Sequence, residues 1–453
     1  MELQINSQYV ENLQGLITIP TVSNADEDKV NFDYFFQLHQ YLEETYPLIH
    51  KTMTKNLIGK ASLLFYRKAK NPKKLPVLLM AHQDVVPVGD VGKWKYDPFS
   101  ARIAEGCIWG RGTTDCKGVM LSELEAVEKL IAEGFEPDYD IYLAYGHNEE
   151  VQAKVKGALL IVDYLAAKGV RLGYVFDEGG NIKSGTDLGY EGYIAQIAMG
   201  EKAYVDYEIY QDTAGGHSME PGAGTALGAV AKGIVAIEDN PLPYRLTPLV
   251  KKQLQARSHY LLGKEREIFA DPESHWAEIM HFAKTDKKLD SILHTTMAVT
   301  MASGSEQSNV LPSHAGAIVN CRLLQGDTVE SIGQHIASVL PEGVFVRKLV
   351  GDNPELIPEV TEETLRLLKN ILQQIYGDNI VVVPALLAGG TDSRFFSKIS
   401  NNVFRFGALF RDERWGQSHQ VDEKIPCDVL ESGVRFFELF LRSYADSNAF
   451  SDH

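Results

Sequence analysis

The sequence predicts an α/β fold in which a mainly parallel central sheet is flanked by helices and a second, α+β domain is inserted. Strand-like and helix-like segments alternate over residues 1–196, which is typical of a parallel sheet. That pattern stops near residue 196 and returns after residue 355. The chain has 453 residues, which is too many for one hydrophobic core. We therefore expect a discontinuous main domain, residues 1–196 and 355–453, and an inserted domain, residues 197–354.

The first block contains the clearest strand and helix patterns. Residues 77–81, VLLMA, are all apolar, as expected for a strand that is covered on both faces. Residues 117–134 carry an apolar stripe at helical spacing that ends at a glycine, which predicts a helix. Strands are expected at 140–147 and 173–180, with a helical segment at 156–169 between them. This strand–helix–strand order favours parallel neighbours in one sheet.

The inserted block has a different pattern. Residues 194–212 alternate in polarity as strands do, and residues 222–239 are helical in spacing. A polar helical stretch follows at 245–285, and strands are expected at 295–304 and 313–324. A separate α+β domain fits this order.

The last block returns to the first pattern. It contains a helical stretch at 361–377, strands at 380–389 and 402–410, and a closing amphipathic helix at 428–446. These elements complete the main domain.

Composition excludes several classes of protein. The net charge of −17 argues against a nucleic-acid partner. The four cysteines show no CxxC spacing, so they predict neither a thiolate zinc cluster nor a disulfide framework. The first residues lack a basic segment followed by an apolar one, and no apolar run reaches 18 residues. We expect a cytoplasmic protein without a membrane span.

Histidine and carboxylate side chains follow several of the predicted strands. His82 and Asp84 come directly after the apolar run at 77–81, and residues two apart in an extended segment point to the same side. His82 can therefore bind a metal ion while Asp84 orients its ring. The other candidates lie at the ends of elements or in loops: Asp115, Glu149, Glu150, Asp177, Glu178 and His419.

Each of these residues has an ordinary explanation when taken alone. Asp115 can cap the helix that starts at residue 117, and Glu149 and Glu150 can be a solvated pair. Open α/β sheets, however, build their sites at the carboxyl ends of strands, where these groups gather. Two histidines with three carboxylates suit Zn²⁺, with Co²⁺ or Mn²⁺ as substitutes.

The motifs together resemble a known family. LLMAHQDVVPV, WKYDPFS, IWGRGTTDCKG, GHNEE, VFDEGG, NVLP and AGGTDSRFF occur in the order found in the co-catalytic zinc hydrolases related to aminoacylase, carboxypeptidase S, acetylornithine deacetylase and succinyl-diaminopimelate desuccinylase. The pattern is most similar to the carboxypeptidase S-like and N-acyl-amino-acid hydrolase branch. Four places depart from it: Gln83, Cys116, LLQGD and SHQVDE. None removes a ligand, and Cys116 as an additional ligand is a minority interpretation.

The resemblance implies a role for each metal-site residue. Asp115 would bridge two zinc ions, with His82 and Asp177 completing one ion and Glu150 and His419 completing the other. Glu149 would be the general base, and Asp84 would lie behind His82. Hydrolysis would proceed through a hydroxide that bridges the two zinc ions.

The resemblance also assigns residues of the inserted domain, which it implies is a lid and dimerisation domain. His217 in AGGHSMEP would reach the active site of the other subunit in a homodimer and stabilise the oxyanion. The substrate carboxylate and carbonyl would be held by Asn309, Arg322, Gly390 and Thr391. From the residues alone, an ordinary turn histidine is the better explanation of His217, and Arg322 is equally explained by an ordinary ion pair on a strand.

The predicted reaction is hydrolysis of an amide bond next to a free carboxylate, in a small peptide or an N-acyl amino acid. The enzyme would be a carboxypeptidase or an N-acyl-amino-acid amidohydrolase. Alternatives are a dipeptidase or deacylase of the same superfamily and a non-catalytic binding protein on the same fold. A phosphate-handling enzyme is discounted, because GRGTTDCKG lacks the spacing of a nucleotide-binding loop.

Overall fold

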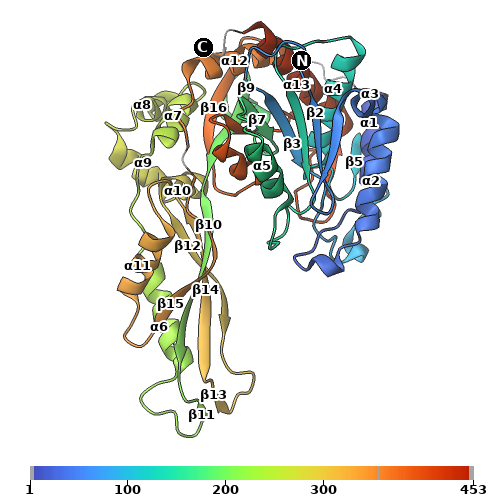
Figure 1. The fold of residues 1–453 in the computed structure, drawn as a ribbon. Helices are drawn as coiled ribbons and strands as arrows, with labels where there is room; N and C mark the ends of the chain where they lie inside the picture. The colour runs from blue at the N-terminus through green and yellow to red at the C-terminus, as the bar shows by residue number, and fades with distance from the viewer. Residues whose placement is uncertain (1–4, 356, 448–453) are drawn as a thin grey trace.

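Two sheets organise the structure, a computed structural model that describes residues 5–355 and 357–447 (Figure 1). The larger sheet runs in the order β1-β2-β6-β3-β7-β17-β9-β16, and β8 pairs with β9 at its side. Its strands are β1 (Thr54–Ile58), β2 (Ser62–Arg67), β3 (Val77–His82), β6 (Ile141–Gly146), β7 (Tyr174–Asp177), β8 (Asn181–Ser184), β9 (Tyr193–Glu201), β16 (Ile380–Leu387) and β17 (Val403–Arg405). The pairs β3–β6, β3–β7, β7–β17 and β9–β16 are parallel. The predicted α/β fold with a mainly parallel central sheet is confirmed.

Helices cover both faces of the large sheet, and the apolar residues of β3 pack against the helices on both of its faces. Leu79 packs in the core beneath one face, while Leu78 and Met80 pack in the core of the other. The first core is closed by α1 (Ser7–Ile17), α2 (Phe32–Thr45), α3 (Pro47–Thr52), α4 (Lys117–Ala132), α12 (Glu362–Tyr376) and α13 (Leu430–Asp446). The second is closed by α5 (Gly157–Ala167) and the short η4 (Asp392–Lys398). A strand buried on both faces has to be apolar throughout, as 77–81 is.

The second sheet forms a long, separate arm (Figure 1). It is antiparallel in the order β12-β14-β10-β15, and α6 (Ala226–Glu238) and α11 (Val329–Val339) pack against it in a core of their own. Its strands are β10 (Ala203–Asp212), β12 (Thr296–Ser303), β14 (His314–Leu323) and β15 (Phe345–Gly351). A two-stranded ribbon of β11 (Gly216–His217) and β13 (Val310–Leu311) lies at the end of the arm far from the large sheet.

The predicted polar helical stretch at 245–285 forms helices that join the two parts. They are α7 (Pro248–Arg257), α8 (Gly263–Ala270), α9 (Trp276–Ala283) and α10 (Lys287–Leu293). Leu386 of β16 packs in the same hydrophobic cluster as Val250 and Leu254 of α7. These helices therefore lie against the edge of the large sheet as well as beside the arm.

The chain passes from one sheet to the other between β9 and β10. β9 stays in the large sheet as far as Glu201, beyond residue 196, at which the sequence analysis placed the first boundary. The division at 197–354 stays a prediction. Among the described residues, none of the helices is both long and apolar enough to cross a membrane.

A small three-stranded sheet in the order β18-β5-β4 completes the part that positions the site. Its strands are β4 (Arg102–Ala104), β5 (Cys107–Trp109) and β18 (Lys424–Pro426).

Candidate metal centre

Neighbouring strands of the large sheet bring the predicted residues to one edge. His82 is the last residue of β3, and it is in register with Gly146, the last residue of the parallel strand β6. Glu149 and Glu150 follow β6 within four residues, and Asp177 ends β7 on the other side of β3. Parallel strands end at the same edge, so groups far apart in sequence meet there.

Asp115 lies between two histidines. Its Oδ1 is 3.0 Å from Nε2 of His82, and its Oδ2 is 3.2 Å from Nε2 of His419. The same nitrogen of His419 is 2.9 Å from Oε2 of Glu150. His82, Asp115, Glu150 and His419 are thus four of the five predicted ligands, and they converge as a bridging carboxylate requires.

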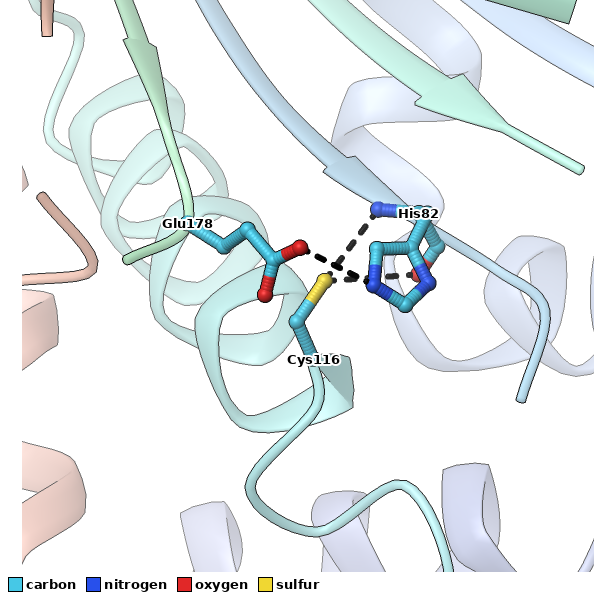
Figure 2. A group of neighbouring side chains, drawn as sticks. All are labelled: His82, Cys116 and Glu178. Carbon is cyan, nitrogen blue, oxygen red and sulfur yellow. Dashed lines mark hydrogen bonds and ion pairs between the residues drawn. The ribbon is translucent and has the colours of Figure 1, made fainter. Parts of the chain in front are cut away.

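Asp177 and Glu178 take different directions. The carboxylate of Asp177 accepts the N–H of Glu178 at 2.8 Å and the N–H of Ser393 at 3.0 Å. Glu178 instead points at His82, and its Oε1 is 3.2 Å from Nε2 of that ring (Figure 2). The assignment of Asp177 as a ligand stays a prediction, and the geometry favours Glu178 for that place.

Asp84 organises the site through its side chain and its carbonyl separately. The ring nitrogen Nδ1 of His82 is 2.9 Å from the carbonyl oxygen of Asp84 and 3.6 Å from its carboxylate. The carboxylate, which is fully buried, accepts the N–H groups of Glu149 and Glu150 at 3.0 and 3.2 Å. Asp84 therefore fixes both the His82 ring and the turn that carries the two glutamates.

The cluster holds more carboxyl groups than histidines, and their crowding shifts several pKa values. Burial would raise the pKa of Asp115, but hydrogen bonds from His419 and His82 outweigh burial and hold it below its ordinary value. The hydrogen bonds to Asp115 and Glu150 raise the pKa of His419 to about 10. Burial, followed by repulsion from Asp115, raises the pKa of Glu178 to about 8. Three carboxylates in so small a space call for added positive charge.

The residues present fit divalent metal ions. Oε1 of Glu150 is buried and has no hydrogen-bond partner within the described part of the chain. One group of potential ligand atoms comes from His82, Asp115 and Glu150, and a second from His82, Cys116 and Glu178. A buried carboxylate oxygen without a donor, beside histidine and further carboxylates, is what a cation would satisfy.

Cys116 lies behind His82 and contacts its backbone. Its sulfur is 3.2 Å from the N of His82 and 3.7 Å from its O (Figure 2). Burial raises the pKa of the thiol well above its ordinary value, and Glu178 adds to the rise. Coordination to a metal ion would itself deprotonate the thiol, so Cys116 stays the minority candidate for a ligand.

Glu149 is half-buried beside the cluster and has the environment of a proton carrier. Burial raises its pKa well above the ordinary value, and repulsion from Asp392 adds to the rise. Its carbonyl accepts a hydrogen bond from Nζ of Lys156 at 2.5 Å, and the same amine donates to the carbonyl of Asn148 at 3.1 Å. The turn that carries Glu149 is therefore anchored from both sides.

The predicted substrate-binding residues fall into separate groups. His217 and Asn309 lie together and exposed on the β11–β13 ribbon, where the carbonyl of Asn309 accepts the N–H of Ser218 at 3.0 Å. Arg322 lies on β14, with its guanidinium 4.8 Å from the centre of the Tyr204 ring. The chain's own fold does not bring the ribbon to the metal centre (Figure 1).

Gly390 and Thr391 lie on the large-sheet side, next to Asp177. The N–H of Thr391 donates to Glu201 at 3.1 Å, and its hydroxyl is 2.6 Å from that of Ser393. Glu201, which the sequence analysis missed, ends β9 and also accepts from Nε of Arg405 at 3.1 Å. Between the adjacent acids of VFDEGG, the prediction chose Asp177 as the ligand, because sequence cannot show which of the two faces His82.

Comparison with known proteins identifies the family. The model of Peptidase family M20/M25/M40 matches residues 78–443. Among curated proteins, the chain is 30% identical over 444 residues to probable carboxypeptidase S-like 2 of Dictyostelium discoideum, covering 95% of this chain and 84% of that protein. It is 29% identical over 449 residues to the human N-fatty-acyl-amino acid synthase/hydrolase PM20D1, covering 97% of this chain and 89% of that protein.

Solved structures share the fold over nearly the whole chain. The M20 family metallo-carboxypeptidase Sso-CP2 from Sulfolobus solfataricus superimposes with a TM-score of 0.71 at 20% identity, covering 97% of this chain and 99% of that one. The YXEP protein of Bacillus subtilis, described as a dinuclear metal-binding peptidase of family M20, has a TM-score of 0.59 at 12% identity, covering 97% and 98% of the two chains. The chain belongs to Peptidase family M20/M25/M40, and it is an enzyme of this metallopeptidase and amidohydrolase family.

Proposed function

We propose that the protein hydrolyses an amide bond next to a free carboxylate, as a carboxypeptidase or an N-acyl-amino-acid amidohydrolase, with two zinc ions in each subunit. The observation that carries the proposal is Asp115, which lies between His82 and His419 with Glu150 and Glu178 on either side. The names of the carboxypeptidase S-like and N-fatty-acyl-amino acid hydrolase relatives support this substrate class. His82, Asp115 and Glu178 would hold one ion, and Asp115, Glu150 and His419 the other.

The ions would polarise the scissile carbonyl and lower the pKa of an attacking water molecule. Glu149 would take the proton from that water and later give it to the leaving amine, which suits a half-buried carboxylate with a raised pKa. Asp84 and Lys156 would keep the turn of Glu149 in place throughout. Arg322, Gly390 and Thr391 remain our candidates for holding the substrate carboxylate.

We infer that the protein acts as a homodimer through the lid. The antiparallel sheet of the arm, which would form the lid, ends in the edge strand β12. Met301 on this strand is 67% exposed, and the neighbouring α6 exposes Leu227. An exposed edge strand with apolar side chains is a surface for pairing with another chain. A two-fold pair would use one interface to serve both sites, and His217 would then serve the other subunit.

A cytoplasmic location stays a prediction. The four cysteines are free and buried, which is consistent with a reducing compartment.

A substrate panel with controlled metal content tests the function. Purified protein would be stripped with a chelator, restored with Zn²⁺, Co²⁺ or Mn²⁺, and assayed with N-acyl amino acids, dipeptides and longer peptides. We expect no activity without metal, and restored cleavage of substrates that keep a free carboxylate. Full activity in the stripped protein would contradict the metal-dependent mechanism. Cleavage of dipeptides alone, or of short-chain acyl groups alone, would point to the dipeptidase or deacylase alternative.

A further inference from the structure

Glu423 lies between two loops that carry candidate metal ligands. It immediately precedes β18, which pairs with β5 so that Lys424 is opposite Trp109. The N–H of Gly110 donates to the carbonyl of Glu423 at 2.9 Å. The backbone thus places the loop at 416–423, which contains His419, beside the loop at 110–115, which ends in Asp115.

The side chain of Glu423 is fully buried and adds hydrogen bonds to the Asp115 loop, one of them to the N–H of Asp115 itself. Its Oε1 accepts N–H groups of Gly112 at 3.1 Å, Thr114 at 2.8 Å and Asp115 at 3.3 Å, and the hydroxyl of Thr114 at 2.8 Å. Its Oε2 accepts from Nη1 of Arg111 at 2.5 Å. All five donors belong to the Asp115 loop, while the acceptor belongs to the His419 loop. Hydrogen bonds to a charged carboxylate are stronger and more directional than neutral ones.

Arg111 connects this contact to the loop that follows His82 and Asp84. Its guanidinium lies 5.2 Å from the centre of the Trp94 ring, and the indole N–H of Trp94 donates to the carbonyl of Val88 at 2.9 Å. Trp94 opens the segment WKYDPFS, to which no role in the reaction was assigned. Trp94 therefore links the loop after His82 and Asp84 to the Asp115 loop and, through Arg111 and Glu423, to the His419 loop.

The His419 loop needs such an anchor. His419 and Asp422 have φ angles of 64° and 61°, in the left-handed region that side chains other than glycine rarely adopt. Such conformations persist only where the surrounding structure holds them. Glu423, directly after Asp422, is the buried and multiply bonded residue of this loop.

We propose that Glu423 is a positioning residue which, with Arg111 and Trp94, holds Asp115 and His419 in place for metal binding. The proposal rests on the proposed function only in taking these two side chains as metal ligands. Residues that orient metal ligands typically contribute 10–100-fold to metal affinity. Glu423→Gln removes the charge and places an amide N–H₂ group among N–H and O–H donors that it cannot accept from. The substitution should therefore reduce the affinity for metal by about 10–100-fold.

The experiment measures Zn²⁺ affinity directly, by competition with a chromophoric chelator, in wild type, Glu423→Gln and Glu125→Gln. Glu125 is the matched control because it too is buried and accepts two hydrogen bonds, from Asn12 at 2.6 Å and Tyr46 at 3.0 Å, yet it touches no ligand loop. We expect weaker Zn²⁺ binding in Glu423→Gln alone. The rise in melting temperature on adding Zn²⁺ should shrink in that variant too, which a purely structural role would leave unchanged.

Each outcome separates this proposal from the proposed function. A Glu423→Gln protein that binds Zn²⁺ as tightly as wild type overturns the role, whatever its stability. If that variant does not fold, Glu423→Asp keeps the charge but shortens the reach of the carboxylate to the Asp115 loop, and wild-type affinity there overturns the role equally. A wild-type protein that binds no divalent ion overturns the metal centre itself and this role with it, while wild-type binding without amidase activity overturns only the proposed reaction.

Discussion

Adjacent acidic residues do different work at this site. Glu149 and Glu150 follow the same strand, yet Glu150 faces His419 while Glu149 lies near Asp392. Asp177 is held by backbone N–H groups while its neighbour Glu178 faces His82. Successive side chains diverge, so one strand end can supply both a ligand and a second group of another kind.

Glu149→Gln should keep the fold and the metal but lose at least about a hundredfold in kcat, the usual contribution of a general base. The amide has the shape of the carboxyl group but cannot accept a proton from water. Single-turnover kinetics and metal analysis of the variant would check this. Normal turnover in a metal-loaded Glu149→Gln protein would show that another group is the base.

Glu178→Gln and Asp177→Asn test which acid binds metal. Because Glu178 is the acid that faces His82, its substitution should weaken Zn²⁺ binding by about 10-fold or more, while Asp177→Asn should mainly disturb the loop at Ser393. Chelator competition on both variants gives the answer. The opposite ranking of the two affinities would restore Asp177 as the ligand.

At the scale of elements, α2 is fastened to the strand end that carries His82. Nε2 of His39 in α2 is 2.7 Å from Oε1 of Gln83, whose amide donates to the carbonyls of Ala61 and Tyr145 at 2.9 and 2.7 Å. Gln83 is one of the departures from the family pattern, and this buried network gives it a structural role. Because the amide donates elsewhere, Oε1 is the acceptor and His39 must donate.

This network makes stability depend on pH. Burial lowers the pKa of His39 to about 4, against 6.5 for an exposed histidine. Between pH 4 and pH 6.5 the unfolded chain therefore binds a proton that folded His39 does not. The free energy of unfolding is unaffected by His39 above pH 6.5 and decreases as the pH falls toward 4. The decrease reaches about 3 kcal/mol near pH 4.

His39→Gln keeps a donor for Gln83 but cannot titrate, so its loss of stability between pH 7 and pH 4.5 should be smaller than that of wild type. Urea unfolding of the metal-free proteins at both pH values measures the difference. His259→Gln, at an exposed histidine, is the control and should behave like wild type. Equal pH dependence in all three proteins would rule out His39 as a source.

At the scale of the molecule, the chain separates its chemistry into two places. The metal-site residues lie at the edge of the large sheet, whereas His217 lies on β11 at the far tip of the arm (Figure 1). The long antiparallel arm keeps the two apart within one chain. In the proposed homodimer, the second subunit would therefore supply this histidine.

Mixing two inactive variants tests this arrangement. His217→Ala and Glu149→Gln proteins would be exchanged into mixed dimers, each of which has one site with both lesions and one with neither. Random exchange should restore about a quarter of the native activity, because half of the dimers are mixed and half of their sites are intact. Activity that stays at the level of the separate variants, despite proven exchange, would place His217 in its own subunit's reaction or outside it.

The fold class and the order of the elements followed from the sequence, which also predicted residues that converge in the structure. Apolar runs and helical stripes are local patterns, and the residues after each strand had to meet because parallel strands end at one edge. His82 and Glu150 come together by this rule, whereas Asp115 and His419 reach them from loops beside β5 and β18.

Only the tertiary structure decided which member of an adjacent pair turns inward and which buried acid holds two loops together. Asp177 and Glu178 are equivalent in sequence, and the choice between them depends on the N–H of Ser393, which is 216 residues away from Asp177. Glu423 depends in the same way on donors about 310 residues earlier, such as Thr114 and Gly112. Contacts of this kind arise from the path of the backbone through space, which no local pattern of residues records.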